Sequence, residues 1–247
     1  TFEGSCSTSK KRPQAEVGVY GASYRVVDQF TAFATMFVNL ELPPMTAAWV
    51  IGNRERFAKL YQGAFDAYSA VAFPLMIGAL LIGQPLMIFI AGANFSASGA
   101  ILGIHMLAMA GIFFSTLFAH IVVVINKQKP MIWGYASVAV FSLIIYPLAI
   151  TRYGMFGAAW ATVATEFIIT IWTFLMVWRT TQLAPKLDLF WKSILASLIM
   201  GAFLALLPNA NLAILLLGGI LIYSTALYML GGIKKQMLKE ITSFKTP

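Results

Sequence analysis

Residues 212–230 read LAILLLGGILIYSTALYML, and this stretch decides the fold class of the chain. It contains no charged residue, and its apolar residues follow one another without the alternation that is typical of a transmembrane β-strand. About 20 such residues in helical conformation cross a bilayer core of about 30 Å. The stretch therefore predicts a transmembrane α-helix.

Apolar runs of similar length recur along the rest of the chain, separated by short polar breaks. Together with the first stretch, the predicted spans are Val19–Leu42, Tyr68–Ala91, Gly99–Ile125, Met131–Ile150, Phe156–Trp178, Phe190–Leu207 and Leu212–Leu230. The breaks contain residues that end helices, namely Pro43-Pro44, Gly92, Pro130, Gly154, Pro185 and Pro208. Hydrophobic residues make up 60% of the chain and charged residues 11%, with a mean hydropathy of +0.80, whereas soluble domains contain roughly half and a quarter. We therefore expect an all-α protein, a polytopic transmembrane helix bundle with about seven spans.

The distribution of cations between the loops predicts the orientation of the bundle. One alternate set of loops, with the C-terminal tail, carries Arg54, Arg56, Lys59, Lys127, Lys129, Arg179, Lys186, Lys192, Lys234, Lys235, Lys239 and Lys245. Beyond the first span, the opposite set carries only Arg152. Because cytoplasmic loops retain Lys and Arg, the net charge of +8 favours a multi-pass membrane protein with a cytoplasmic C-terminus over a nucleic-acid-binding protein.

The first residues do not fit this orientation, because Lys10, Lys11 and Arg12 fall on the side opposite the other cations. The rule is statistical, so a short basic head can be an exception to it. Alternatively, the chain is a fragment that has lost a preceding span. We expect three parts, namely a head that is disordered or outside its native context (residues 1–14), a helix bundle (residues 15–233) and a basic cytoplasmic tail (residues 234–247).

Polar residues recur on one face of the first predicted span. At helical spacing this face carries Arg25, Asp28, Gln29, Ala32, Thr35 and Asn39, and the opposite face carries Val26, Phe30, Phe33, Phe37 and Leu40. Ionisable groups inside a bilayer are costly and indicate a functional role. We expect the aromatic face to meet lipid and the polar face to meet protein or a hydrated cavity. The alternative is that Arg25 and Asp28 only neutralise each other within the helix.

The fifth predicted span has the same design. Its inward face carries Ala158, Thr162, Glu166, Thr170 and Thr173, and its outward face carries Trp160, Phe167, Ile171, Phe174 and Trp178. Glu166 would either bind a coupling cation or proton, or pack while hydrogen-bonded to a neighbouring helix. His105 and His120 lie about 22 Å apart along one helix, so we expect two packing histidines and no metal site.

Three segments match, in order along the chain, the motifs of one protein family. Residues 16–25 (EVGVYGASYR) resemble the motif vGiYsaAyrl, and Pro43-Pro44 resembles the proline that closes the same helix. Residues 88–95 (IFIAGANF) resemble i.llfGpef, and residues 153–166 (YGMFGAAWATVATE) resemble yGi.GAAiATviSE, the most specific of the three. Over residues 15–239 the chain thus resembles the C-terminal half of a polysaccharide-repeat-unit flippase of the multidrug/oligosaccharidyl-lipid/polysaccharide exporter superfamily.

The resemblance implies spans eight to fourteen of a fourteen-span, two-lobe exporter, with a missing N-terminal lobe as partner. The implied function is translocation of undecaprenyl-diphosphate-linked oligosaccharide repeat units across the bacterial cytoplasmic (inner) membrane, for surface polysaccharide and lipopolysaccharide biosynthesis. The implied roles are attraction of the diphosphate for Arg25, lining of the path for Gln29, Asn39 and Thr162, and ion coupling for Asp28 or Glu166. Membrane lipid and the lipid-linked oligosaccharide are the implied partners, and no cofactor or nucleic acid is implied.

Two other functions stay open. One is a multidrug or small-molecule cation-coupled exporter of the same superfamily, because a fold does not define its substrate. The other is a membrane enzyme of polysaccharide assembly, such as a polymerase or ligase, which would carry catalytic residues on a large external loop. The outer breaks at residues 93–98, 151–155 and 208–211 are only a few residues long, and the sequence offers no constellation of nucleophile, base and metal ligands. We therefore expect a transporter and not an enzyme.

Overall fold

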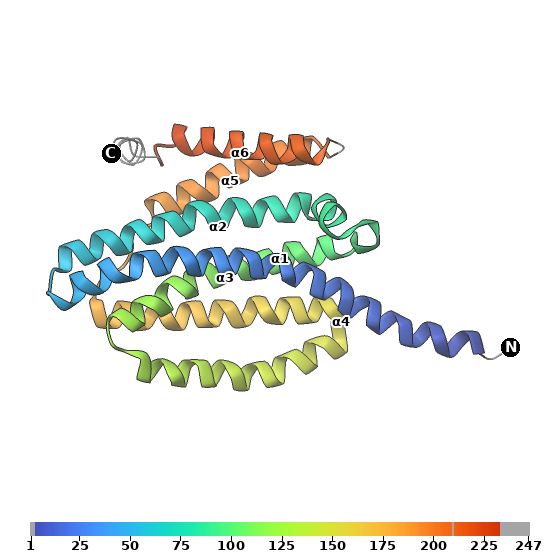
Figure 1. Cartoon of the computed structure of the whole chain (residues 1–247), viewed down its shortest axis with the longest axis horizontal. Helices are drawn as coiled ribbons and strands as arrows, with labels where there is room; N and C mark the ends of the chain where they lie inside the picture. The colour runs from blue at the N-terminus through green and yellow to red at the C-terminus, as the bar shows by residue number, and fades with distance from the viewer. Residues whose placement is uncertain (1–2, 209, 233–247) are drawn as a thin grey trace.

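The computed structural model describes residues 3–208 and 210–232, with side chains from residue 18 onward. Within these ranges the chain is helical and contains no strand, which confirms the predicted all-α class. The elements are α1 (Glu3–Val50), α2 (Arg54–Ala91), the short 3-10 helix η1 (Ala93–Phe95), α3 (Ser98–Val124), α4 (Gln128–Thr181), α5 (Asp188–Leu206) and α6 (Leu212–Met229) (Figure 1). Helix α1 begins within the predicted head, and the predicted basic tail lies outside the described residues.

Five of the helices, α2 to α6, are each long and apolar enough to cross a membrane. Helix α1, which carries Arg25 and Asp28, is not one of the five. Large apolar side chains, among them Trp133, Leu143 and Leu206, are exposed on the outside of the bundle. Such a surface is unfavourable in water and suits a lipid environment, so the protein is a membrane-embedded helix bundle.

Helix α4 is two antiparallel arms joined at Gly154. This residue has φ 58° and ψ −138°, a backbone conformation outside the helical region that glycine adopts without a steric penalty. Residues on either side of it meet across the two arms: Gly134 lies against the ring of Trp172, and the hydroxyl of Tyr146 is 2.9 Å from that of Thr162. In Figure 1 the chain reverses at this point. The predicted break between the fourth and fifth spans is therefore confirmed as a reversal of the chain.

The prediction that Pro43-Pro44 ends the first helix is wrong, because α1 continues to Val50. Proline has no backbone N–H, so the carbonyl groups four residues earlier, at Asn39 and Leu40, lose their usual helical partners. Both residues are exposed. The unpaired carbonyls therefore lie at the surface of the bundle, where other partners can reach them.

Helix α3 lies at the centre of the bundle, in contact with α1, α2 and α4, and has buried residues on all sides. An aromatic cluster joins α3 to α2 and α5 and consists of Phe65, Phe73, Phe114, Phe118 and Phe190. Helices α5 and α6 form a hairpin that packs mainly on α2 (Figure 1). This arrangement leaves one long side of α1 free of neighbouring helices.

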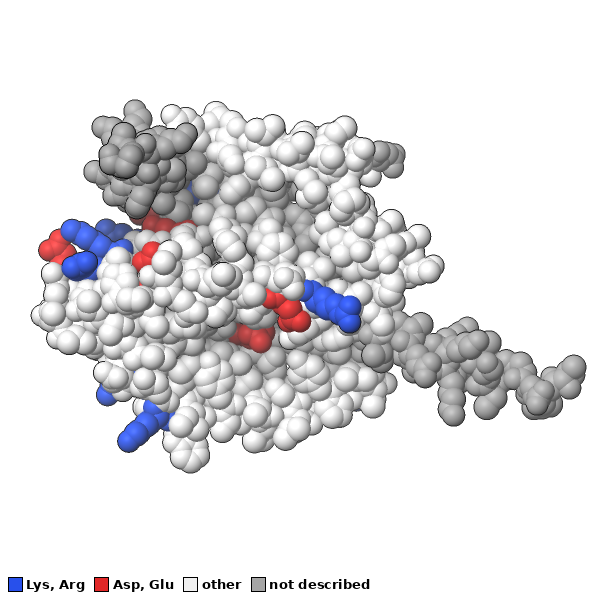
Figure 2. Space-filling model, in the orientation of Figure 1, with Lys and Arg blue, Asp and Glu red and all other residues white. Residues whose placement is uncertain are grey.

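The cation-rich turns come together at one end of the bundle. A guanidinium nitrogen of Arg54 donates to the carbonyl of Thr181 (3.4 Å), which links the start of α2 to the end of α4. The amide of Gln62 bonds the backbone of Lys186 in both directions, through its oxygen (2.7 Å) and its nitrogen (3.0 Å). Most of the basic atoms in Figure 2 gather at this end, at the left of the view. The alternation of cations in the sequence is thus matched by their placement in space.

Candidate functional site

Helix α1 carries four of the predicted site residues. Arg25, Asp28, Gln29 and Asn39 are all exposed. The structure forms no ion pair between Arg25 and Asp28, so the alternative that they neutralise each other within the helix is not what the structure adopts. Both charges are available to a ligand or to a further protein surface.

The prediction that the aromatic face of α1 meets lipid is only partly correct. Phe33 and Leu40 are exposed, but Val26, Phe30 and Phe37 pack against the core. The buried stripe of α1 instead contains three small side chains, Ser23, Ala34 and Ala48, together with Val27, Val38 and Met45. Small residues let two helix backbones approach closely, which favours association in a membrane more than apolar bulk does.

A cavity of about 840 Å³ lies beside α1 and contains two of the predicted residues. Arg25 and Gln29 line it from α1, and Ile90 and Phe95 line it from the end of α2 and from η1. A guanidinium has five N–H donors in a planar fork that matches phosphate or carboxylate oxygens. The cavity can therefore bind an anionic group at Arg25.

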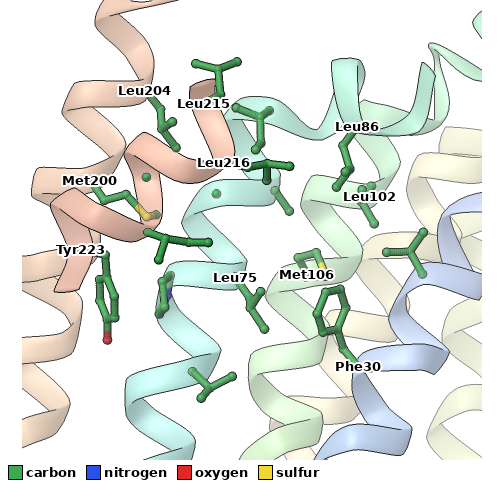
Figure 3. Close-up of a pocket in the computed structure, with 18 of the residues that line it drawn as sticks. Phe30, Leu75, Leu86, Leu102, Met106, Met200, Leu204, Leu215, Leu216 and Tyr223 are labelled. Carbon is green, nitrogen blue, oxygen red and sulfur yellow. The ribbon is translucent and has the colours of Figure 1, made fainter. Parts of the chain in front are cut away.

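A second cavity, of about 390 Å³, is almost purely apolar (Figure 3). It lies between α1, α2 and α3 on one side and the α5–α6 hairpin on the other, and its labelled lining residues include Leu75, Met106, Met200, Leu204 and Leu215. The hydroxyl of Tyr223 donates a hydrogen bond to the carbonyl of Ala70 (2.7 Å). Val26 and Phe30 line this groove and the Arg25 cavity alike. A cationic pocket and an apolar groove therefore share a wall.

Thr162 is buried and joins α1 to both arms of α4. Its hydroxyl donates to the carbonyl of Ala158 (3.1 Å) and lies 2.9 Å from the hydroxyl of Tyr146 and 3.4 Å from that of Tyr20. Because its one proton goes to Ala158, both tyrosines donate to it. The prediction that Thr162 lines an open path is therefore wrong, since this side chain is a buried hydrogen-bonding centre that fixes three helical segments.

His105 fixes α1 to α3 a turn further along. The hydroxyl of Ser23 donates to the carbonyl of Tyr20 (2.8 Å) and lies 3.1 Å from Nδ1 of His105, so Nδ1 carries the proton and donates to it. The rings of Tyr20 and Tyr24 stand at 84° and 88° to the imidazole. Nε2 is buried and has no hydrogen-bond partner among the described residues. The predicted packing role is therefore confirmed for His105, whereas half-buried His120 bonds the carbonyl of Thr116 in its own helix (2.7 Å).

The two predicted ion-coupling carboxylates belong to different helices and share one tyrosine as an electrostatic neighbour. Tyr24 is within electrostatic range of both Asp28 on α1 and Glu166 on α4. Glu166 packs against Gly111 of α3, but its carboxylate makes no hydrogen bond to the described residues, so the hydrogen-bonded alternative is not what the structure adopts. The described residues include no group of three potential metal ligands.

The faces predicted for the fifth span agree with the structure, except at one position. Thr162 and Thr173 are buried, whereas Trp160 and Trp178 are exposed. Phe174, predicted to face outward, packs against Phe118 of α3.

The sequence analysis did not identify the tyrosines of this region as site residues. It also placed Arg25 and Asp28 on one face, whereas the structure places them in two different groups. Tyr20, Tyr24 and Asp28 follow one another at intervals of four residues, a spacing that places them on one side of a helix and was a usable signal. In the structure the buried Thr162 contacts Tyr20, Asp28 and Glu166 are electrostatic neighbours of Tyr24, and Arg25 and Gln29 line the separate cavity. Asn39 is about 15 Å further along α1 and belongs to neither group.

Comparison with models of known protein families finds no match, and comparison with curated proteins finds none either.

Proposed function

We propose that the chain forms one lobe of a membrane flippase for lipid-linked oligosaccharides whose lipid carries a diphosphate. One observation carries the proposal: the cavity that contains Arg25 and the apolar groove beneath the α5–α6 hairpin share Val26 and Phe30 as a common wall. An anionic lipid has the same two parts, a charged head and an apolar chain, joined at one point. The resemblance of residues 153–166 to a flippase motif supports the same conclusion.

In this proposal each part of the site has one task. Arg25 binds the diphosphate through charge-assisted hydrogen bonds, and Gln29 beside it donates to the sugar or phosphate oxygens. The apolar groove accommodates part of the isoprenoid chain, because its lining is almost purely apolar. The exposed side of α1 borders the path of the hydrophilic sugars, and Asp28 with Glu166 takes up a proton or cation that drives the cycle.

The orientation belongs to the same proposal. The two arms of α4 count as two spans and α1 as one, so that the bundle crosses the bacterial inner membrane seven times. The cationic end is cytoplasmic, in keeping with the excess of Lys and Arg in cytoplasmic loops, and the C-terminus lies on that side. The free side of α1 faces a second lobe, and alternating access arises from rocking of the two lobes.

A second candidate is a cation-coupled exporter of small cationic molecules. It is favoured by the grouping of Tyr24 with two carboxylates, because aromatic rings and carboxylates together bind organic cations. The two candidates differ in the sign of the substrate charge. Substitution of Arg25 impairs the first function, whereas substitution of Asp28 and Glu166 impairs binding of an organic cation.

Ligand binding to the purified chain in nanodiscs of zwitterionic lipid tests the proposal. Undecaprenyl diphosphate should bind, and Arg25→Ala should weaken it by about 10- to 100-fold, the loss typical of a hydrogen bond to a charged group. Uncharged undecaprenol should bind the wild type and this variant equally, and Arg152→Ala serves as the matched control, because Arg152 belongs to the same side of the bundle but does not line the cavity. Equal affinity of Arg25→Ala and wild type for the diphosphate would remove the basis of the proposal.

A further inference from the structure

The cationic end of the bundle carries more basic than acidic side chains. Its cations within the described residues are Arg54, Arg56, Lys59, Lys127, Lys129, Arg179, Lys186 and Lys192. The same end carries three acidic residues, Glu55, Asp66 and Asp188, of which Glu55 pairs with Lys59 (2.7 Å) and Asp66 accepts a hydrogen bond from Gln62 (2.8 Å). The cations therefore outnumber the acidic side chains. A surface of this kind attracts an external anion.

Arg54 is held in a fixed position at this end. Its guanidinium lies over the ring of Trp49, 4.7 Å from the centroid, and donates one hydrogen bond to the carbonyl of Thr181. The remaining N–H groups of the fork are open to a ligand, because Arg54 is exposed. Arg179 lies two residues before Thr181 and is also exposed. Arg54 and the last turn of α4, which carries Arg179, therefore lie at the same end of the bundle.

The segment between α4 and α5 adds a third cation. Both polar atoms of the Gln62 side-chain amide bond the backbone of Lys186. The segment is therefore fastened to the first turns of α2, and the exposed side chain of Lys186 extends from a fixed backbone. Arg54, Arg179 and Lys186 form what we call the basic platform.

The neighbours of the basic platform are apolar and aromatic. Val50 and Ile51, in the turn that leads to Arg54, are 73% and 68% exposed. Trp178 lies beside Arg179 in the sequence, and its ring is 44% exposed. Tryptophan is enriched at the boundary between headgroups and acyl chains. A soluble anion would leave these side chains in water, whereas a lipid covers them.

We propose that the basic platform binds the phosphate headgroup of an anionic phospholipid of the surrounding leaflet, with Val50 and Ile51 against its acyl chains. The guanidinium of Arg54 supplies the direct phosphate contact, and Arg179 and Lys186 add charge. This site is separate from the Arg25 cavity, so the proposal of a lipid site does not depend on the transport proposal. It provides a lipid contact at the junction of α1, α2 and α4.

Lipid binding to the purified full chain in detergent tests this site. Phosphatidylglycerol should bind and raise the melting temperature more than phosphatidylcholine does. Each removed cation should weaken binding about fivefold, so Arg54→Gln with Arg179→Gln should weaken it roughly 25-fold. Arg179→Gln with Lys186→Gln removes two charges while leaving every described hydrogen bond in place, so it gives the same test without disturbing the fold. Arg152→Gln, at the opposite end, should bind as the wild type does.

Three outcomes overturn the inference. These are equal binding of the two lipids, unchanged phosphatidylglycerol affinity in both double variants, and an equal rise in melting temperature with inorganic phosphate alone. The last outcome would identify a soluble anion as the ligand in place of a lipid. Loss of undecaprenyl diphosphate binding in Arg25→Ala would leave this inference untouched, because the two sites share no residue.

Discussion

Replacement of Gly99 by alanine should force α2 and α3 apart. Gly99 lies in the first turn of α3 and faces the backbone of α2. A Cβ at this position would lie 2.5 Å from the backbone nitrogen of Gln84 and 2.8 Å from the carbonyl carbon of Gly83, where ordinary contacts begin at 3.4 Å. These are backbone atoms, so no side-chain rotation can relieve the overlap.

The expected loss follows from two opposing terms. Alanine in a helix is favoured over glycine by roughly 0.5–1 kcal/mol. Overpacking of a tight interface costs typically about 1–3 kcal/mol, and a shift of 0.5–1 Å forfeits a quarter to a half of the attraction of each contact that is pulled apart. Because the overlapping atoms belong to the backbones of α2 and α3, we expect the overlap to outweigh the gain in helix propensity and the free energy of unfolding to fall by about 1–3 kcal/mol.

Denaturation of the purified protein in mixed micelles, followed by circular dichroism, measures this change. Gly63→Ala is the matched control, because Gly63 lies within α2, is exposed and has no atom within 4 Å of its added Cβ. This control should raise the free energy of unfolding by up to about 1 kcal/mol. If Gly99→Ala were as stable as the wild type while Gly63→Ala was stabilised, the close approach of α2 and α3 at Gly99 would be refuted.

The remaining predictions concern the hydroxyl centre and the topology. Thr162→Val keeps the shape of the side chain but leaves the hydroxyls of Tyr146 and Tyr20 without their acceptor, so the free energy of unfolding should fall by about 1–3 kcal/mol. Thr162→Ser keeps the hydroxyl and should stay near wild type. Equal stability of the two variants would contradict the hydrogen-bond assignment. Reporter fusions after Lys59, Lys129 and Lys186 should be cytoplasmic, because these three sites lie in the cation-rich turns at one end of the bundle. A fusion after Arg152 should be periplasmic. A periplasmic signal from any of the first three fusions would contradict the predicted topology.

The helical segments could be predicted because each depends on local sequence. A run such as residues 212–230 has no other stable conformation in a bilayer, where every backbone group must be paired within the segment. The reversal at Gly154 was visible as a glycine between two apolar runs. The extension of α1 through Pro43-Pro44 was not, because a proline ends a helix only when the carbonyls that it leaves unpaired have no other partner.

The site was harder to predict because it depends on which side of α1 meets the bundle. The sequence divides α1 into a polar and an aromatic face, and neither is the buried stripe. Ser23, Val27 and Ala34 form that stripe at the boundary between the two faces. Hence the polar residues are divided between two sides of one helix, with Arg25 at the cavity and Asp28 toward Tyr24 and Glu166.

The glycines of α3 explain why apolarity alone cannot locate an interface in this protein. A bilayer is as apolar as a leucine side chain, so burial in protein gives a leucine little advantage over exposure to lipid, and close packing decides instead. Gly99 and Gly103 face Gln84 and Leu80 of α2, and Gly111 faces Glu166 of α4. These three positions alone place α3 between two neighbours, which its uniformly apolar sequence does not. The spacing of small residues is therefore the part of such a sequence that carries information on tertiary contacts, and the same rule accounts for the buried stripe of α1.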